Sequence, residues 1–86
     1  MTETSVPEPL AFRVDSRDVQ GASVVEVAGE VDAHTAPTVH DAVEAAIAPG
    51  ARVIVDLREV SFLDSTGLGV FVIALKHVRE AEGTLD

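Results

Sequence analysis

One stretch of the sequence, from Asp56 to Ala81, constrains the fold more than any other. A β-branched, apolar run over Arg52–Leu57 predicts a buried strand, and the long apolar sequence that follows predicts a helix over Thr66–Ala81. The sequence DSTG at residues 64–67 stands where that helix begins, and backbone N–H groups there have no partner within the helix. These groups and the positive end of the helix dipole favour an anion, so the hydroxyl of Ser65 is well placed to carry a phosphoryl group.

The preceding residues predict two short strands and a helix. Strands are expected over Ala11–Asp15 and Ala22–Ala28, joined by a turn within residues 17–21 and closed by Gly29–Asp32. A helix is expected over Thr35–Ile47, with Thr35 as its N-cap, because apolar residues recur at three- and four-residue spacings. The order strand, helix, strand, helix implies a right-handed crossover between parallel strands, and therefore an α/β fold.

The segments around the second helix carry further expectations. Residues 58–63 are expected to form a loop, with Val60, Phe62 and Leu63 tucked beneath it. The first half of the helix is apolar almost all round, so we expect it to be largely buried, and we expect Gly83 to cap its end. Since three residues remain after Gly83, the final strand and helix of an alternating pattern are expected to be missing. An open sheet edge invites pairing with another chain, which predicts a truncated form or a homo-oligomer.

Composition limits the classes of function. The 86 residues make one domain over residues 10–86, preceded by a polar, proline-containing tail over residues 1–9 that is expected to be disordered. The net charge of −9 argues against binding to nucleic acids or to anionic membranes. The absence of cysteine excludes disulfides and thiolate catalysis. No leader is visible and the longest apolar run is too short to span a bilayer, so a cytoplasmic location is expected.

No pattern in the chain favours a metal, a cofactor or a catalytic group. His34, His40 and His77 are scattered, and the first two lie six residues apart rather than at the spacing of helical metal pairs. The Gly-x-Ser-x-Gly pattern of a hydrolase is missing, and the sequence around Gly67 and Gly69 lacks the third glycine of a dinucleotide site. Two plainer alternatives stay open at the helix starts, namely that Ser65 and Asp32 serve only as helix caps.

The motifs GEVDAHTAPTV and VIVDLREVSFLDSTGLGVFV, within the segment from Val24 to Gly83, resemble STAS domains, specifically bacterial anti-sigma factor antagonists. The resemblance implies a mixed β-sheet with helices packed mainly on one face. It also implies a protein that is not an enzyme and that works by partner switching. Such proteins bind an anti-sigma factor that is a serine kinase of the GHKL type, which frees a sigma factor for RNA polymerase. The kinase inactivates them by phosphorylation, and a PP2C-type phosphatase restores them.

The resemblance assigns roles to six positions. Ser65 is the implied phosphoacceptor, with Thr66 as the runner-up. The implied partner-binding residues are Asp32, Asp64, Thr66, Gly67 and Gly69. The alternative from another class is a STAS scaffold or sensor module, which would assemble with its own copies or regulate a larger complex without control of a sigma factor.

Overall fold

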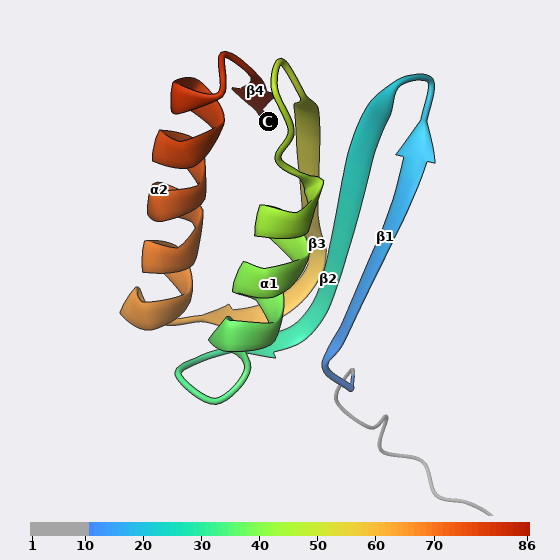
Figure 1. Cartoon of the computed structure of the whole chain (residues 1–86). Coiled ribbons are helices and arrows are strands. Elements are labelled where there is room, and N and C mark those ends of the chain that lie inside the picture. The colour runs from blue at the N-terminus through green and yellow to red at the C-terminus, as the bar shows by residue number, and fades with distance from the viewer. Residues whose placement is uncertain (1–10) are drawn as a thin grey trace, which may run out of the picture.

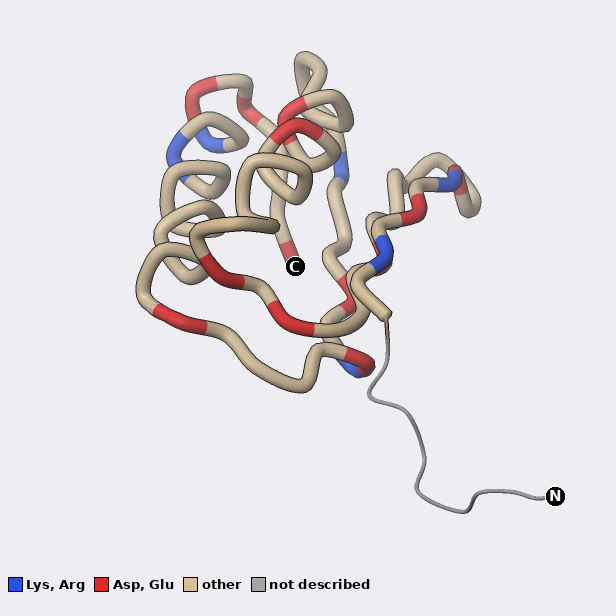
Figure 2. The backbone as a smooth tube through the Cα atoms, turned by 90° about the horizontal axis from the view of Figure 1, so that it is seen from below, with Lys and Arg blue, Asp and Glu red and all other residues tan. Residues whose placement is uncertain are grey.

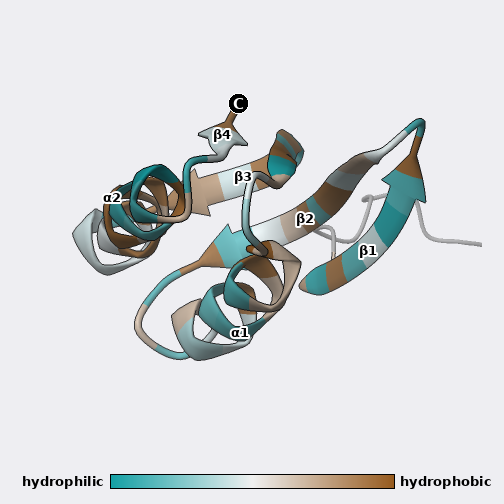
Figure 3. Cartoon of the chain, turned by 45° about the horizontal axis from the view of Figure 1, so that its top comes forward, coloured by the Kyte–Doolittle hydropathy of each residue, from teal (hydrophilic) through white to brown (hydrophobic). Residues whose placement is uncertain are grey.

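The computed structural model describes residues 11–86, and the tail predicted over residues 1–9 lies outside this described part. A four-stranded mixed sheet, in the order β1-β2-β3-β4, carries two helices on one of its faces (Figures 1 and 3). The predicted fold class is confirmed. The elements in chain order are β1 (Arg13–Val19), β2 (Ala22–Val31), α1 (Ala36–Ala46), β3 (Arg52–Leu63), α2 (Ser65–Glu80) and β4 (Thr84–Leu85).

The predicted hairpin is present, but its bounds differ from the prediction. Strand β1 runs from Arg13 to Val19 and pairs with β2 in antiparallel fashion, down to the pair Val19↔Ala22. The turn is therefore Gln20-Gly21 alone, with φ angles of 51° and 85°. Two positive φ angles are the geometry of the tight hairpin turn that matches the twist of the strands. The polar residues of β1 look like a turn in sequence, and their pairing with β2 overrides that local preference.

The centre of the fold is the parallel pairing of β2 with β3, and α1 makes the crossover between them. Strand β2 continues past the predicted end at Ala28 to Val31, so Gly29–Val31 belongs to the strand rather than closing the hairpin. Burying one valine contributes about 1.5–3 kcal/mol, and small apolar residues of β2, α1 and α2 build the core together. These residues are Val25, Val27, Val31, Ala36, Val39, Val43, Val70 and Ala74.

Strand β3 is longer than predicted. Residues 58–63, expected to be a loop, remain in the strand and pair with β2 as far as Val31↔Leu63. The pairing of β2 with β3 shifts register twice here, between Glu26 and Ala28 and between Gly29 and Glu30. Such bulges allow a strand with irregular side-chain alternation to stay in the sheet. Val60 packs against the core as expected, but Phe62 is 51% exposed and Leu63 36% exposed, so the prediction that they are tucked under a loop is wrong.

The prediction that the first half of α2 is largely buried is also wrong. The helix buries one stripe, formed by Gly67, Val70, Ala74 and Val78. Leu68, Val72 and Ile73 are 54%, 61% and 48% exposed. A helix that lies on one face of a sheet contacts it with residues three and four apart, so covering the opposite side requires a further element. Neither helix of residues 11–86 is long and apolar enough to cross a membrane.

The end of α2 differs in detail from the expected glycine cap. Glu82, with φ 62°, adopts the left-handed conformation, and the N–H of Gly83 donates to the carbonyl of Val78 at 2.9 Å. Gly83 is needed for another reason, because a Cβ there would collide with the carbonyl of Ala51. The final strand, expected to be missing, is present as the two residues of β4, which pair in parallel with Arg52 and Val53.

Two glycines of α2 offer a direct test of this packing. A Cβ at Gly67 would lie 2.7 Å from side-chain atoms of both Leu63 and Val31, whereas a Cβ at Gly69 would meet nothing within 4 Å. We expect Gly67→Ala to destabilise the fold by about 1–2 kcal/mol, because overpacking outweighs the better helix propensity. We expect Gly69→Ala to be stabilising by about 0.5–1 kcal/mol.

The measurement is urea unfolding followed by far-UV circular dichroism, since the chain has no Trp or Tyr. Equal effects of the two substitutions would contradict the close approach of Gly67 to Val31 and Leu63.

Candidate functional site

The loops that lead into the two helices lie at the same end of the molecule. Parallel strands have their carboxyl ends at one edge of the sheet, and Val31 and Leu63 are register partners there. The N–H of Asp64 donates to the carbonyl of Val31 at 3.2 Å, which joins the two strand ends. Asp32 directly follows Val31, and Asp64 directly follows Leu63. The two aspartates therefore start from neighbouring strand ends. Figure 2, which looks onto this end, shows acidic residues along both loops.

At the start of α2, the cap is Asp64. Its carboxylate accepts a hydrogen bond from the N–H of Gly67 at 2.9 Å, and its carbonyl accepts one from the N–H of Leu68 at 2.9 Å. Ser65 is the first residue of the helix and is exposed. Within residues 11–86 its hydroxyl takes part in no hydrogen bond. The alternative that Ser65 is only a helix cap is therefore wrong, since Asp64 fills that role and leaves the hydroxyl of Ser65 open to solvent.

The remaining predicted residues of this loop differ in their surroundings. Thr66 is exposed beside Ser65. Gly67 is buried against Val31 and Leu63, so its missing side chain serves packing within the chain. Gly69 is half-buried, and a Cβ there would meet open space.

Asp32 organises the loop before α1. Its carboxylate accepts hydrogen bonds from the N–H groups of His34 at 2.9 Å and Thr35 at 3.1 Å. The backbone hydrogen bond from Thr35, followed by that from His34, lowers the pKa of Asp32 below its ordinary value. The carboxylate therefore orders the loop that leads into α1 and does not cap the helix, which begins at Ala36, and the half-buried group stays ionised at neutral pH.

Thr35 occupies the predicted N-cap position, but its side chain does not cap α1. The hydroxyl instead donates to the carbonyl of Glu30 at 2.8 Å and accepts from the N–H of Asp32 at 3.0 Å. Thr35 therefore ties the end of β2 to the loop, a role that a capping pattern in the sequence does not reveal.

The three histidines do not come together at one place. His77 approaches the two carboxylate oxygens of Glu44 at 2.8 and 2.9 Å and so links α2 to α1. His40 lies 3.8 Å from the same carboxylate, and His34 is exposed in the loop before α1. In the part of the chain that the structure describes, no three His, Asp or Glu side chains group in a way that could hold a metal ion.

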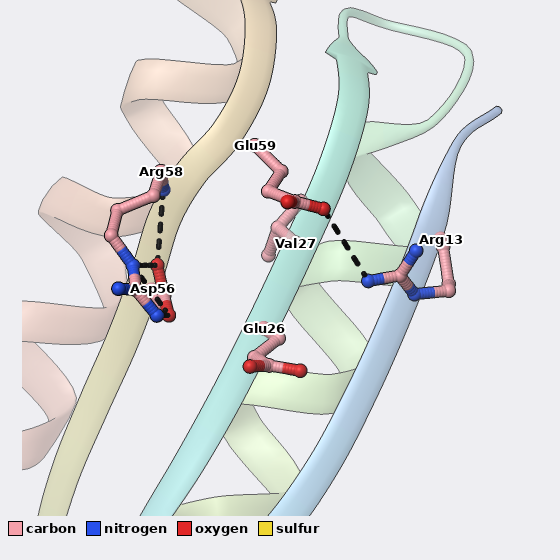
Figure 4. A pocket seen from close by; sticks show the side chains of 6 residues that line it. All are labelled: Arg13, Glu26, Val27, Asp56, Arg58 and Glu59. Atoms are coloured by element: carbon pink, nitrogen blue, oxygen red, sulfur yellow. Dashed lines mark hydrogen bonds and ion pairs between the residues drawn. The ribbon is translucent and has the colours of Figure 1, made fainter. Parts of the chain in front are cut away.

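A polar groove of about 360 Å³ lies on the face of the sheet turned away from the helices (Figure 4). The sequence did not predict it. Arg58 donates to Asp56 from two nitrogens at 2.7–3.1 Å, and these hydrogen bonds lower the pKa of Asp56 to about 2. Arg13 lies 3.8 Å from Glu59. Both guanidinium groups are thus paired with carboxylates of the same chain. We therefore interpret the charged residues of this groove as structural ion pairs.

Comparison with known proteins gives a consistent result. The STAS domain family model matches residues 13–85. The anti-sigma-B factor antagonist of Listeria monocytogenes is 43% identical over 77 residues, which are 88% of this chain and 67% of that protein. The anti-sigma-B factor antagonist of Bacillus subtilis is 38% identical over 76 residues, covering 88% of this chain and 70% of that protein.

Solved structures of anti-sigma factor antagonists have the same fold as this chain. An anti-sigma factor antagonist from Mycobacterium paratuberculosis superposes with a TM-score of 0.78 at 30% identity, covering 93% of this chain and 70% of that chain. The antagonist SpoIIAA in its unphosphorylated form gives a TM-score of 0.68 at 25% identity, covering 87% of this chain and 69% of that chain. The phosphorylated form of Bacillus SpoIIAA gives the same TM-score of 0.68 and covers 87% of this chain and 68% of that chain. The chain therefore belongs to the STAS domain family, and the relatives compared above are bacterial anti-sigma factor antagonists.

Proposed function

We propose that this chain is an anti-sigma factor antagonist, which binds an anti-sigma factor with serine kinase activity of the GHKL type and thereby releases a sigma factor. One observation carries the proposal: the hydroxyl of Ser65 is exposed at the first position of α2 while Asp64 occupies the cap. The 43% identity to an anti-sigma-B factor antagonist supports the same role.

The chain supplies a phosphoryl acceptor and no catalytic base. In the transfer, Oγ of Ser65 forms a bond to the γ-phosphorus of ATP, the bond from that phosphorus to the bridging oxygen breaks, and ADP leaves. The carboxylate of Asp64 is committed to the N–H of Gly67, so the base that takes the hydroxyl proton comes from the kinase. A PP2C-type phosphatase would hydrolyse the phosphoserine and restore the hydroxyl.

The acidic surroundings explain how phosphorylation would end binding. A phosphoryl group adds a charge of about −1.5 to −2 at neutral pH. At the start of α2 the unpaired N–H groups accommodate this charge locally, so the fold is retained. The new charge also adjoins Asp64 and lies at the end of the sheet that carries Asp32. A partner surface whose charge is complementary to the unphosphorylated site is no longer complementary to the more negative one. The partner therefore does not bind.

The acceptor can be identified by intact mass after incubation with ATP and candidate anti-sigma factor kinases. We expect one phosphoryl group on the parent chain and on Thr66→Ala, and none on Ser65→Ala. Thr66 is an adjacent exposed hydroxyl, which makes it the matched control. Loss of phosphorylation in Thr66→Ala alone would assign the acceptor to Thr66 and contradict the proposal.

If charge repulsion ends binding, two substitutions of similar size at Ser65 should differ in their affinity for the partner. We expect Ser65→Asp to weaken binding to the anti-sigma factor by at least about tenfold, because like charges brought together at an interface cost several kcal/mol. Ser65→Asn introduces nearly the same volume as Ser65→Asp and no charge, so we expect binding close to that of the parent. Isothermal titration calorimetry measures both, and equal affinities for the two variants would refute the electrostatic mechanism.

In the structure Asp32 orders the loop before α1, and in the proposal it contacts the partner; two substitutions separate these roles. An asparagine at this position would keep an oxygen for the N–H groups of His34 and Thr35. We therefore expect Asp32→Asn to unfold near the urea midpoint of the parent and to bind the partner about tenfold more weakly. We expect Asp32→Ala to lower the midpoint as well, because those N–H groups lose their acceptor. Unchanged binding by Asp32→Asn would restrict Asp32 to ordering the loop before α1.

A further inference from the structure

One aromatic side chain stands outside the core. The chain has three phenylalanines and neither Trp nor Tyr. Phe12 and Phe71 pack against the core cluster, whereas Phe62, near the end of β3, is 51% exposed. Burial within residues 11–86 therefore does not explain an aromatic residue at position 62.

Strand pairing fixes the direction in which Phe62 points. Glu30↔Phe62 and Val31↔Leu63 are successive register pairs of β2 with β3. The side chains of Val31 and Leu63 lie against Gly67, on the face of the sheet that α2 covers. Successive residues of a strand point to opposite faces, so Phe62 and Glu30 point away from the helices.

Phe62 lies close to the proposed phosphoacceptor. It precedes Ser65 by three residues, and a chain spans at most about 3.6 Å per residue, so the two Cα atoms are at most about 11 Å apart. Between them, the N–H of Asp64 donates to the carbonyl of Val31 at 3.2 Å, which holds this part of the chain against the end of β2. The phenyl ring and the acceptor hydroxyl therefore belong to the same end of the molecule.

A protein that phosphorylates Ser65 has to cover this end. Phosphoryl transfer needs the γ-phosphorus of ATP at about 3–3.5 Å from Oγ of Ser65. A specific interface buries about 800 Å² on each partner, which is a patch of about 16 Å radius. Phe62 is nearer to the acceptor than this radius. The partner that reaches Ser65 from the side of β3 therefore also covers the exposed ring.

We propose that Phe62 is the apolar anchor through which the anti-sigma factor kinase holds this chain, an inference that rests on the proposed function of Ser65. The fitting partner surface is an apolar pocket for the phenyl ring, with basic side chains around it that face Glu30 and Asp64. Aromatic side chains bury a large apolar area and are enriched in the cores of interfaces. Phe62 then supplies affinity to the unmodified chain, and the charge of a phosphoryl group on Ser65 opposes it.

The first test observes the ring itself by ¹⁹F spectroscopy of the chain labelled with 4-fluorophenylalanine. The signal missing from Phe62→Leu identifies position 62, and the signals of Phe12 and Phe71 are internal controls. We expect the signal of Phe62 to show the largest shift between H₂O and D₂O in the free chain, because its ring is the exposed one. We expect that solvent shift to disappear when the unlabelled kinase binds in the presence of ADP, which leaves Ser65 unmodified. A solvent shift that persists at position 62 in the saturated complex would overturn the anchor.

The second test measures affinity by isothermal titration calorimetry with the same kinase and ADP. We expect Phe62→Ala to weaken binding at least about tenfold, and Val19→Ala to leave it unchanged. Val19 is also an exposed apolar residue, at 42%, but it lies at the hairpin end of β1. We expect both variants to keep the urea midpoint of the parent, because neither side chain belongs to the core cluster.

The outcomes separate this inference from the proposed function. Unchanged affinity of Phe62→Ala, with Ser65 of the parent still phosphorylated, would overturn the anchor and leave the proposed function intact. A lowered urea midpoint that accounts for the weaker binding of Phe62→Ala would assign the residue a structural role, which also overturns the anchor. If no anti-sigma factor kinase binds or phosphorylates the parent, the proposed function fails and the anchor fails with it.

Discussion

The parallel pairing of β2 with β3 is the interaction on which the rest of this structure depends. Parallel neighbours cannot be joined by a tight turn, so the chain must cross over, and α1 makes that crossing above the buried valines of β2. The same direction of both strands brings their carboxyl ends together, with Val31 beside Leu63. The two loops that follow, which begin at Asp32 and Asp64, therefore share one end of the molecule. The parallel pairing of β2 with β3 thus brings the residues of the candidate site together.

Within that site, helix capping and the proposed switching are divided between neighbouring side chains. Asp64 satisfies an N–H group of the first turn of α2, which leaves the hydroxyl of Ser65 unused by the fold. Asp32 does the same for the loop before α1. Both carboxylates stabilise local structure, and both add negative charge where a phosphoryl group would arrive. A modification at Ser65 would accordingly change the electrostatic surface while these hydrogen bonds, and with them the starts of both helices, stay in place.

Sequence patterns predicted the features that depend on interactions between residues close together in the chain. The start of α2, the crossover and the apolar stripe of α1 follow from spacing and caps. The failures have tertiary causes. Residues 58–63 carry charges that disguise a strand, and pairing with β2 holds them in the sheet. Leu68 and Val72 are apolar but exposed, because apolar character in a sequence does not say whether a covering element is present. The hydroxyl of Thr35 bonds a carbonyl five residues earlier, a contact that propensity cannot reveal.

The central claim is that a phosphoryl group on Ser65 is accommodated at the start of α2 without any change of fold. The most direct measurement compares ¹H–¹⁵N spectra and thermal midpoints of the chain with serine and with phosphoserine at position 65. The account predicts that shifts of the amide signals are confined to the loops that begin at Asp32 and Asp64 and to the first turn of α2, with a midpoint close to that of the unmodified chain. Shifts that spread through β2 and α1, or a collapse of the midpoint, would contradict it.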